Sequence, residues 1–220
     1  MPFDLGDLSG ARDWPFHANA LDQGNHGWCT GFGLADFGIN DPIQDAYTND
    51  DGKRFYYLCK VEDGEPGQEN GSTVRSVAKV AQNIGRITAY AWAASTDEIT
   101  YWLLHQGPVI VGVNWYYGME TPDAKNIIHP TGGVAGGHCF LLNEKTDNEL
   151  YGLQNSWGST WGVNGKAYIS IKDFGDLLAA DGEAMTAVEE PLSPEPPAPD
   201  PVKPGCWPTL KARFGIRERR

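Results

Sequence analysis

The 220-residue sequence contains few cysteines and few basic residues for its length. Its four cysteines are widely spaced, at Cys29, Cys59, Cys139 and Cys206. This spacing is unlike the dense disulfide framework of a small secreted domain, so we expect a reducing compartment. Only 17 Lys and Arg residues oppose 29 Asp and Glu residues, which gives a formal charge of −12. Because a phosphate backbone requires a basic footprint, this charge argues against nucleic acid as the main partner.

Long apolar runs are also absent. No segment approaches the ~18 consecutive apolar residues of a transmembrane helix, so no membrane partner is expected. The first residues, from Met1 to Asp7, contain neither the basic nor the apolar region of a secretory signal peptide. We therefore expect synthesis in the cytoplasm, without an export signal.

The composition that remains is that of a globular protein. Hydrophobic residues make up 40% of the chain, which is enough apolar material for one well-packed domain. Residue patterns predict three helices in the first half. The first covers residues 27–37 and opens near Cys29. The second is capped by Ser72 or Thr73 and ends at Gly85, and the third opens on a Ser95–Glu98 capping box and ends at Gly107.

Short β-rich runs follow the predicted helices, at residues 109–113, 139–142, 150–153 and 167–171. Helices first and strands later predict an α+β domain over residues 1–190. Its helical half spans about 1–108 and its β half about 109–190. A functional site is expected in the cleft between the two halves.

The composition changes after residue 190. Residues 191–205 contain seven prolines and are predicted to form an extended spacer. The spacer leads to an aromatic anchor and a basic end, formed by Trp207, Lys211, Arg213, Arg217, Arg219 and Arg220. We predict that residues 191–220 are a docking tail that binds another protein chain.

Three separate stretches carry side chains that suit nucleophilic catalysis by a thiol. The first, residues 22–29, places Cys29 after a Gly-rich turn at the predicted start of a helix, where the helix dipole favours a thiolate. The second, 136–140, brings His138 into an apolar strand, and the third, 154–165, contains Asn155. Each stretch alone is typical of core packing or of a turn. Together they supply a nucleophile, a base and a group that orients the base.

The combination of these motifs resembles the papain family of cysteine peptidases. The family motif Gln-Gly-x-x-Gly-x-Cys corresponds to residues 23–29, and Asn-Ser-Trp-Gly-x-x-Trp-Gly-x-x-Gly corresponds to residues 155–165 throughout. Matches run from about residue 11 to 171, and they include Asp13-Trp14 and the loop 69–72. The resemblance implies a papain-like fold with a helical N-terminal half and an antiparallel, β-barrel-like C-terminal half. It also implies a peptidase that needs neither a cofactor nor a metal.

The resemblance further implies a role for each site residue. Cys29 is the nucleophile, His138 is its base, and Asn155 orients the base. The Gln23 side chain and the Cys29 backbone N–H bind the oxyanion, and Trp157 shields the bond between the base and its orienting residue. Substrate contacts are expected from Trp157 and also from Trp28, Asn70, Gly71 and Gly137.

Several features differ from the family pattern. Many relatives have a disulfide-bonded cysteine where His26 stands, and a Trp where Thr30 follows the nucleophile. The ring of Trp28, just before the nucleophile, would narrow or move the cleft. Cys29 and His138 are closer in sequence than the ~130–150 residues typical of the family. With no inhibitory pro-region expected, the chain resembles a compact bacterial or phage-type variant.

Two other interpretations stay open at the level of sequence. A catalytically idle papain-like module of a larger assembly, such as a phage virion, would account for the altered surroundings of Cys29 and for the tail. It would not account for the retention of Cys29, His138, Asn155 and Gln23 together. A zinc site built from His26-x-x-Cys29 and His138-Cys139 would leave the Asn155 motif unexplained. The expected substrate is a peptide or protein, and analogy makes the stem peptide of peptidoglycan one candidate.

Overall fold

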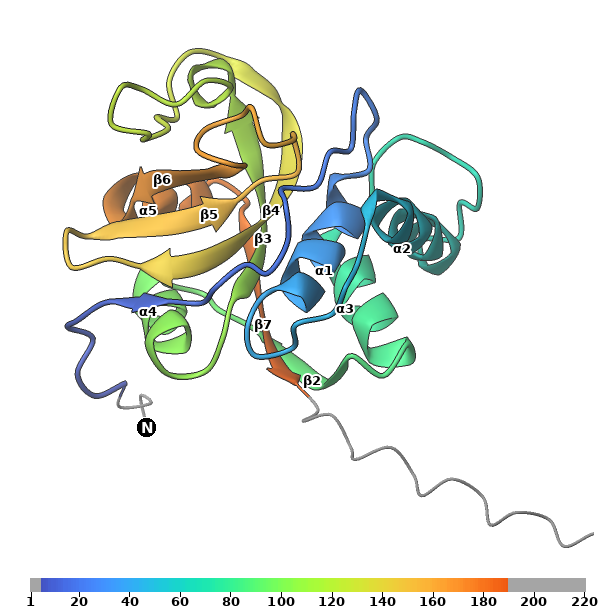
Figure 1. Ribbon diagram of the computed structural model, residues 1–220, viewed down its shortest axis with the longest axis horizontal. Helices are drawn as coiled ribbons and strands as arrows, with labels where there is room; N and C mark the ends of the chain where they lie inside the picture. The colour runs from blue at the N-terminus through green and yellow to red at the C-terminus, as the bar shows by residue number, and fades with distance from the viewer. Residues whose placement is uncertain (1–4, 190–220) are drawn as a thin grey trace, which may run out of the picture.

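The computed structural model describes residues 5–189, and within this range seven strands form one antiparallel sheet (Figure 1). Their spatial order is β2 (Ile87–Trp92), β7 (Glu183–Glu189), β3 (Val109–Tyr116), β4 (Val134–Lys145), β5 (Leu150–Gln154) and β6 (Lys166–Ser170), and β1 (Arg12–Asp13) pairs with the end of β4. The α+β class is confirmed. Among the described residues, however, β2 and β6 each pair with one strand of this order, so the sheet is open rather than barrel-like.

Helices cover both faces of this sheet (Figure 1). On one side lie α1 (Cys29–Ile39), α2 (Asn49–Glu62) and α3 (Val74–Asn83), and on the other lie α4 (Thr96–His105) and α5 (Ile171–Ala179). Within residues 5–189, no helix combines the length and the apolar character that crossing a bilayer requires. The predicted spacer and docking tail, 191–220, lies outside the described residues.

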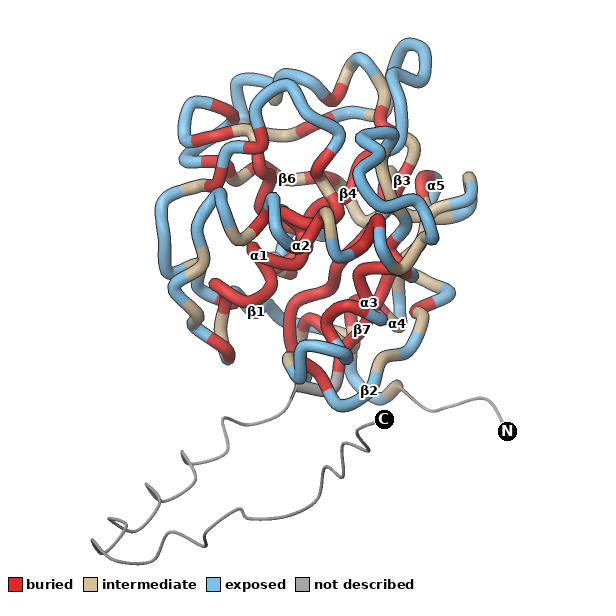
Figure 2. Tube along the Cα trace, turned by 90° about the vertical axis from the view of Figure 1, so that its right-hand side faces the viewer, coloured by how far each residue is buried: buried red, intermediate tan, exposed pale blue. Residues whose placement is uncertain are grey.

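Alternation along the central strands separates two hydrophobic cores. On β3, Ile110 packs with the core of α1, α2 and α3, whereas Val109 and Val111 pack with the core of α4 and α5. Successive side chains of a strand point to opposite faces, which produces this division. The same alternation on β4 sends Cys139 toward α1 and Phe140 away from it. Figure 2 shows buried positions along the strands and along the helices that pack beside them.

Glycines allow α1 to lie closely between α2 and the sheet. A Cβ atom on Gly31 would come within 2.2 Å of the Gly52 carbonyl oxygen and of the Tyr56 nitrogen, both in α2. A Cβ atom on Gly33 would come within 2.9 Å of the Cys139 sulfur on β4. The low helix propensity of glycine is therefore offset by close packing on two sides. This packing fixes the position of the first residue of α1, which is Cys29.

The predicted helix starts at residues 73 and 95 are confirmed. The Thr73 side chain accepts a hydrogen bond from the Ser76 N–H and caps α3. The Ser95 side chain accepts from the Glu98 N–H and caps α4. Each cap satisfies a backbone donor that would otherwise be free at the helix start.

An N-terminal segment crosses from the helices to the strands beside the site. The Gln23 N–H donates to the Ser156 carbonyl oxygen at 2.9 Å, and the Gly158 N–H donates to the Leu21 carbonyl oxygen at 2.8 Å. These backbone bonds bring the turn before α1 next to the loop after β5. Residues that are far apart in the sequence are thereby held at one place.

Candidate active site

Cys29 lies at the N-terminus of α1, where several backbone N–H groups are directed at its sulfur. Burial raises the pKa of the Cys29 thiol, and hydrogen bonds from the N–H groups of Cys139, Thr30 and Cys29 itself oppose this rise. The start of the helix adds its partial positive charge at the same place. These groups stabilise a thiolate once a proton acceptor stands nearby.

His138 provides a proton acceptor, and its hydrogen bond to Asn155 fixes the position of the ring proton. The Asn155 Oδ1 lies 2.8 Å from His138 Nε2, and it also accepts from the Ser156 N–H at 2.9 Å. A backbone N–H can only donate, so the atom facing it is the amide oxygen. His138 Nε2 must then carry the hydrogen, which leaves Nδ1 of the neutral ring free to accept a proton.

Two tryptophans enclose the histidine. The Trp157 ring lies 4.8 Å from the His138 ring between centroids, and the Trp115 ring lies at the same distance on an edge-to-face contact. Trp115 and Asn155 are buried, with 3% and 0% of their surfaces exposed. The bond between the base and Asn155 is therefore kept from bulk water, which strengthens it.

Burial disfavours a lone charge on either Cys29 or His138. It lowers the pKa of His138 to about 4, while the hydrogen bond with Asn155 acts in the opposite direction. A proton that moves from the thiol to the imidazole would leave the cavity neutral overall. The attraction between the two resulting charges would oppose the cost of desolvating each of them.

The Gln23 side chain, in the turn before α1, is held by two hydrogen bonds. Its Oε1 accepts from the Ser156 hydroxyl at 2.7 Å, and its Nε2 donates to the His26 carbonyl oxygen at 2.6 Å. The side chain is 7% exposed. An amide nitrogen carries two hydrogens, so one donor remains for a ligand.

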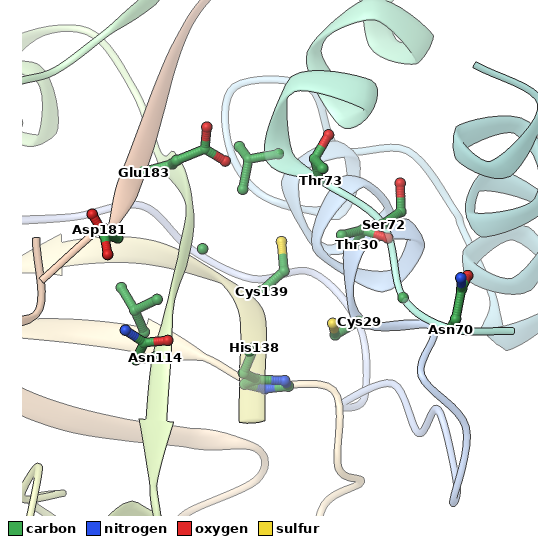
Figure 3. Close-up of a pocket in the computed structure, with 15 residues that line it drawn as sticks. Cys29, Thr30, Asn70, Ser72, Thr73, Asn114, His138, Cys139, Asp181 and Glu183 are labelled. Atoms are coloured by element: carbon green, nitrogen blue, oxygen red, sulfur yellow. The ribbon is translucent and has the colours of Figure 1, made fainter. Parts of the chain in front are cut away.

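A cavity of about 350 Å³ contains both Cys29 and His138 (Figure 3). Asn70, Gly71 and Gly137, which the sequence places at the substrate, also line this cavity. Trp28 does not. It is 8% exposed, and its ring stacks on His26 at 3.7 Å between centroids. This differs from the predicted role of Trp28 in the cleft, because its indole packs toward α2 instead.

Sequence reasoning missed several residues of this site. Trp115 and Ser156 contact His138 and Gln23, yet neither stands out in the sequence from other packing residues. Glu183, the first residue of β7, and Asp181, two residues before it, also line the cavity, and β7 was not predicted. Among residues 5–189, no three His, Cys, Asp or Glu side chains gather in a way that could hold a metal ion.

The chain is similar to known proteins in both sequence and structure. No protein-family model matches the chain. Over 89 residues the chain is 33% identical to mouse cathepsin O, a match that spans 38% of this chain and only 28% of that protein. The structure aligns with xylellain, a cysteine protease from Xylella fastidiosa, at a TM-score of 0.70 and 18% identity, over 85% of this chain and 88% of xylellain.

Two further solved structures align over most of this chain. Bromelain from Ananas comosus, in complex with the E64 inhibitor, gives a TM-score of 0.56 at 13% identity, over 82% of this chain and 99% of bromelain. Digestive procathepsin L 3 of Tenebrio molitor gives 0.53 at 15% identity, over 86% and 73% of the two chains. These likenesses, each below 25% identity, show that the chain has the papain-like fold.

Proposed function

We propose that this protein is a cysteine endopeptidase that hydrolyses peptide bonds with Cys29 as its nucleophile. The observation that carries the proposal is the 2.8 Å hydrogen bond between His138 Nε2 and Asn155 Oδ1, on a histidine that shares one cavity with Cys29. Thiol catalysis requires a nucleophile, a base and a group that fixes the tautomer of the base, and these three side chains supply those functions.

In the first half of the reaction, the Cys29 sulfur attacks the carbonyl carbon of the scissile bond. The carbonyl oxygen becomes an oxyanion, which accepts hydrogen bonds from the Cys29 backbone N–H and from the free Nε2 donor of Gln23. The imidazolium of His138 then protonates the leaving nitrogen as the carbon–nitrogen bond breaks. The products of this half are an amine and a thioester on Cys29.

In the second half, a water molecule replaces the amine. His138, now neutral, accepts a proton from the water as the water oxygen attacks the thioester carbon. The carbon–sulfur bond breaks, the acid product leaves, and the sulfur returns as a thiolate beside the imidazolium. Asn155 holds the ring in one orientation throughout, so that the same Nδ1 accepts and donates the proton.

The idle-module interpretation is not favoured. An idle site has no need to keep Gln23, His138 and Asn155 hydrogen-bonded around a cysteine at a helix start. The Gln23 bonds to two loops and the buried Asn155 amide both require space in the core that apolar residues could fill more favourably. Their arrangement is better explained by catalysis.

The epoxide E-64, with mapping of the modified residue, tests this proposal. We expect modification of Cys29 and none of Cys59 or Cys139, because burial raises the pKa of Cys59 to about 12 and the pKa of Cys139 also rises on burial. Cleavage of internally quenched peptides should fall by about three orders of magnitude or more in Cys29→Ala. Cleavage at internal bonds would identify an endopeptidase.

Cys206→Ala is the matched control for Cys29→Ala. It removes a thiol outside residues 5–189 and should leave turnover unchanged. The melting temperature of Cys29→Ala should stay close to that of the parent, because its side chain is partly exposed at the cavity. Full turnover in Cys29→Ala, or modification of Cys29 no faster than of Cys59, would refute the proposed mechanism.

A further inference from the structure

His138 has one rotation that its hydrogen bond to Asn155 restrains only weakly. Figure 3 shows the His138 ring reaching from β4 toward Cys29, and the Asn155 Oδ1 holds its Nε2 at 2.8 Å. This bond prevents a full flip of the ring, but the torsion about the Cβ–Cγ bond of a histidine is intrinsically soft. A smaller rotation moves Nδ1 more than Nε2 and turns the Nδ1 lone pair away from Cys29. A further contact must therefore set the plane of the ring.

Two indoles contact the histidine ring from different directions. The Trp157 ring is inclined at 37° to the His138 ring and the Trp115 ring at 71°, each at 4.8 Å between centroids. The two indoles are themselves edge-to-face, at 5.2 Å and 75°. A histidine ring that rotated out of its plane would meet one indole or the other, because close-packed side chains leave no space for it.

The strands direct Trp115 to His138 rather than to its own cross-strand partner. In the ladder of β3 and β4, Val113 stands opposite His138 and Trp115 stands opposite Gly136. Trp115 and His138 are therefore diagonal neighbours on one face of the sheet, a separation that aromatic side chains can span. A Cβ atom on Gly136 would meet nothing within 4 Å, so the indole leans away from Gly136 and toward the histidine.

Stability alone does not account for an indole at this place. Trp115 is 3% exposed, and its Nε1 has no hydrogen-bond partner in the described chain. The nearby Trp161, in contrast, donates from its Nε1 to the Glu120 carbonyl oxygen at 2.8 Å. A buried donor without a partner is unfavourable, and a purely apolar side chain would avoid that cost. The contact of the indole with His138 gives a reason for its presence.

We propose that Trp115 is a positioning residue that fixes the plane of the His138 ring and keeps Nδ1 directed at the Cys29 sulfur. Asn155 sets which nitrogen carries the hydrogen, and Trp115 sets where the lone pair of the other nitrogen points. Turnover depends on both, because a misplaced proton acceptor lowers the rate without weakening substrate binding. The link to turnover rests on the proposed function, whereas the fixed plane of the ring does not.

Trp115→Leu removes the flat ring, and Trp115→Phe retains one. With internally quenched peptides, we expect kcat to fall about tenfold to a hundredfold in Trp115→Leu, with KM within about twofold of the parent. Trp115→Phe should recover most of this loss. Should Trp115→Leu not fold, Trp115→Met takes its place, because methionine adapts to the shape of the space it fills.

The reactivity of Cys29 gives a second measure of the same effect. The pH midpoint for its alkylation by iodoacetamide should rise by about one unit in Trp115→Leu, because the thiolate loses the imidazolium beside it. Burial and the Asn155 hydrogen bond are the influences on the pKa of His138, and no Asp, Glu, Lys or Arg of residues 5–189 adds to them. A shift of the midpoint therefore reports on the Cys29–His138 pair.

Trp161→Leu is the matched control. The Trp161 ring contacts those of Trp115 and Trp157, and within residues 5–189 it makes no ring contact with His138. This variant should lower the melting temperature as Trp115→Leu does, and it should leave kcat and the alkylation midpoint close to those of the parent. If the two leucine variants give the same kcat and the same midpoint, the proposal is overturned.

Ring dynamics measured by NMR separate this proposal from the proposed function. In protein labelled with ¹³C-histidine, the order parameter of the His138 ring should be about 0.85 in the parent and below about 0.6 in Trp115→Leu. A mobile ring in the folded parent overturns the proposal. The expected pattern in a protein that cleaves nothing would support the positioning role and refute the proposed function. Cleavage with the same ring order in Trp115→Leu and Trp161→Leu would instead refute the positioning role alone.

Discussion

Lys60→Met should destabilise the protein substantially, because the Lys60 ammonium is the centre of a buried network. The Lys60 side chain is 2% exposed, and its Nζ lies 2.7 Å from a Glu65 carboxylate oxygen and 3.2 Å from one of Asp63. It also donates to the Gly71 carbonyl oxygen at 2.9 Å. Methionine retains most of the buried stem and removes only the charge and its hydrogen bonds.

The magnitude follows from the burial of each partner. Breaking a fully buried ion pair costs about 3–5 kcal/mol, because one charge is left without compensation. Here the side chain of Glu65 is 50% exposed and can turn to water, whereas Asp63 is 14% exposed and keeps its hydrogen bond from the Ser76 hydroxyl. Because both carboxylates keep a favourable partner, we expect Lys60→Met to lower the free energy of unfolding by about 2–3 kcal/mol, less than for a fully buried pair. Urea denaturation should show it as a midpoint lower by about 1 M.

Lys79→Met provides the matched control. Lys79 also forms an ion pair at 2.7 Å, with Glu62, but its side chain is 46% exposed. Exposed pairs of this kind contribute about 0–1 kcal/mol, so this variant should unfold close to the parent. Equal effects of the two substitutions would refute the reasoning, because burial would then not decide the contribution of the lysine.

Two further predictions concern the helix that begins at Cys29 and the histidine that we propose as its base. Gly31→Ala should lower the melting temperature in calorimetry, because the added Cβ would lie 2.2 Å from backbone atoms of α2. Gly136→Ala is the control and should leave the melting temperature unchanged, because its added Cβ would meet no other part of the structure within 4 Å. With Cys29 capped as a neutral carboxamidomethyl thioether, His138 should titrate with a pKa of about 4 by NMR. Because the folded value lies below the ordinary one of 6.5, the capped protein should lose stability as pH falls from about 6.5 toward 4. A titration near 6.5 in the folded, capped protein would contradict this.

Elements with strong local signals were predicted correctly from the sequence. The helices that begin after Thr73 and Ser95 carry capping residues at their first turns, and the runs at 109–113 and 139–142 are short and rich in β-formers. In each case the residues that decide the structure are neighbours in sequence. The same holds for the motif that starts at Asn155, whose spacing is read directly.

Elements whose stability comes from distant partners were not predicted. Helix α2 contains Gly52 and a charged first turn, and its amphipathic pattern is weak because Lys60 is buried while Leu58 and Val61 are exposed. Strands β2 and β7 pair with each other although about half the chain separates them. Because each strand depends on a distant partner, the residue pattern of β2 or β7 alone does not predict it. The two carboxylates at the start of β7 that line the cavity were missed for the same reason, because their place requires the position of β7.

Around the nucleophile, hydrogen bonds and charge hold the two loops that many papain relatives join by a disulfide. The sequence resemblance places His26 where many papain relatives have the bridging cysteine. The His26 Nδ1 lies 3.2 Å from Glu69 Oε2, and the Tyr57 hydroxyl donates to Glu69 Oε1 at 2.7 Å. Both His26 and Glu69 are nearly half exposed, so this link contributes little stability on its own. The second loop is held further by the buried Lys60 ammonium, which donates to the Gly71 carbonyl oxygen, and by the Tyr56 hydroxyl, which donates to the Gln68 carbonyl oxygen. A reducing environment would not loosen such an arrangement, whereas loss of the lysine charge would free one wall of the cavity.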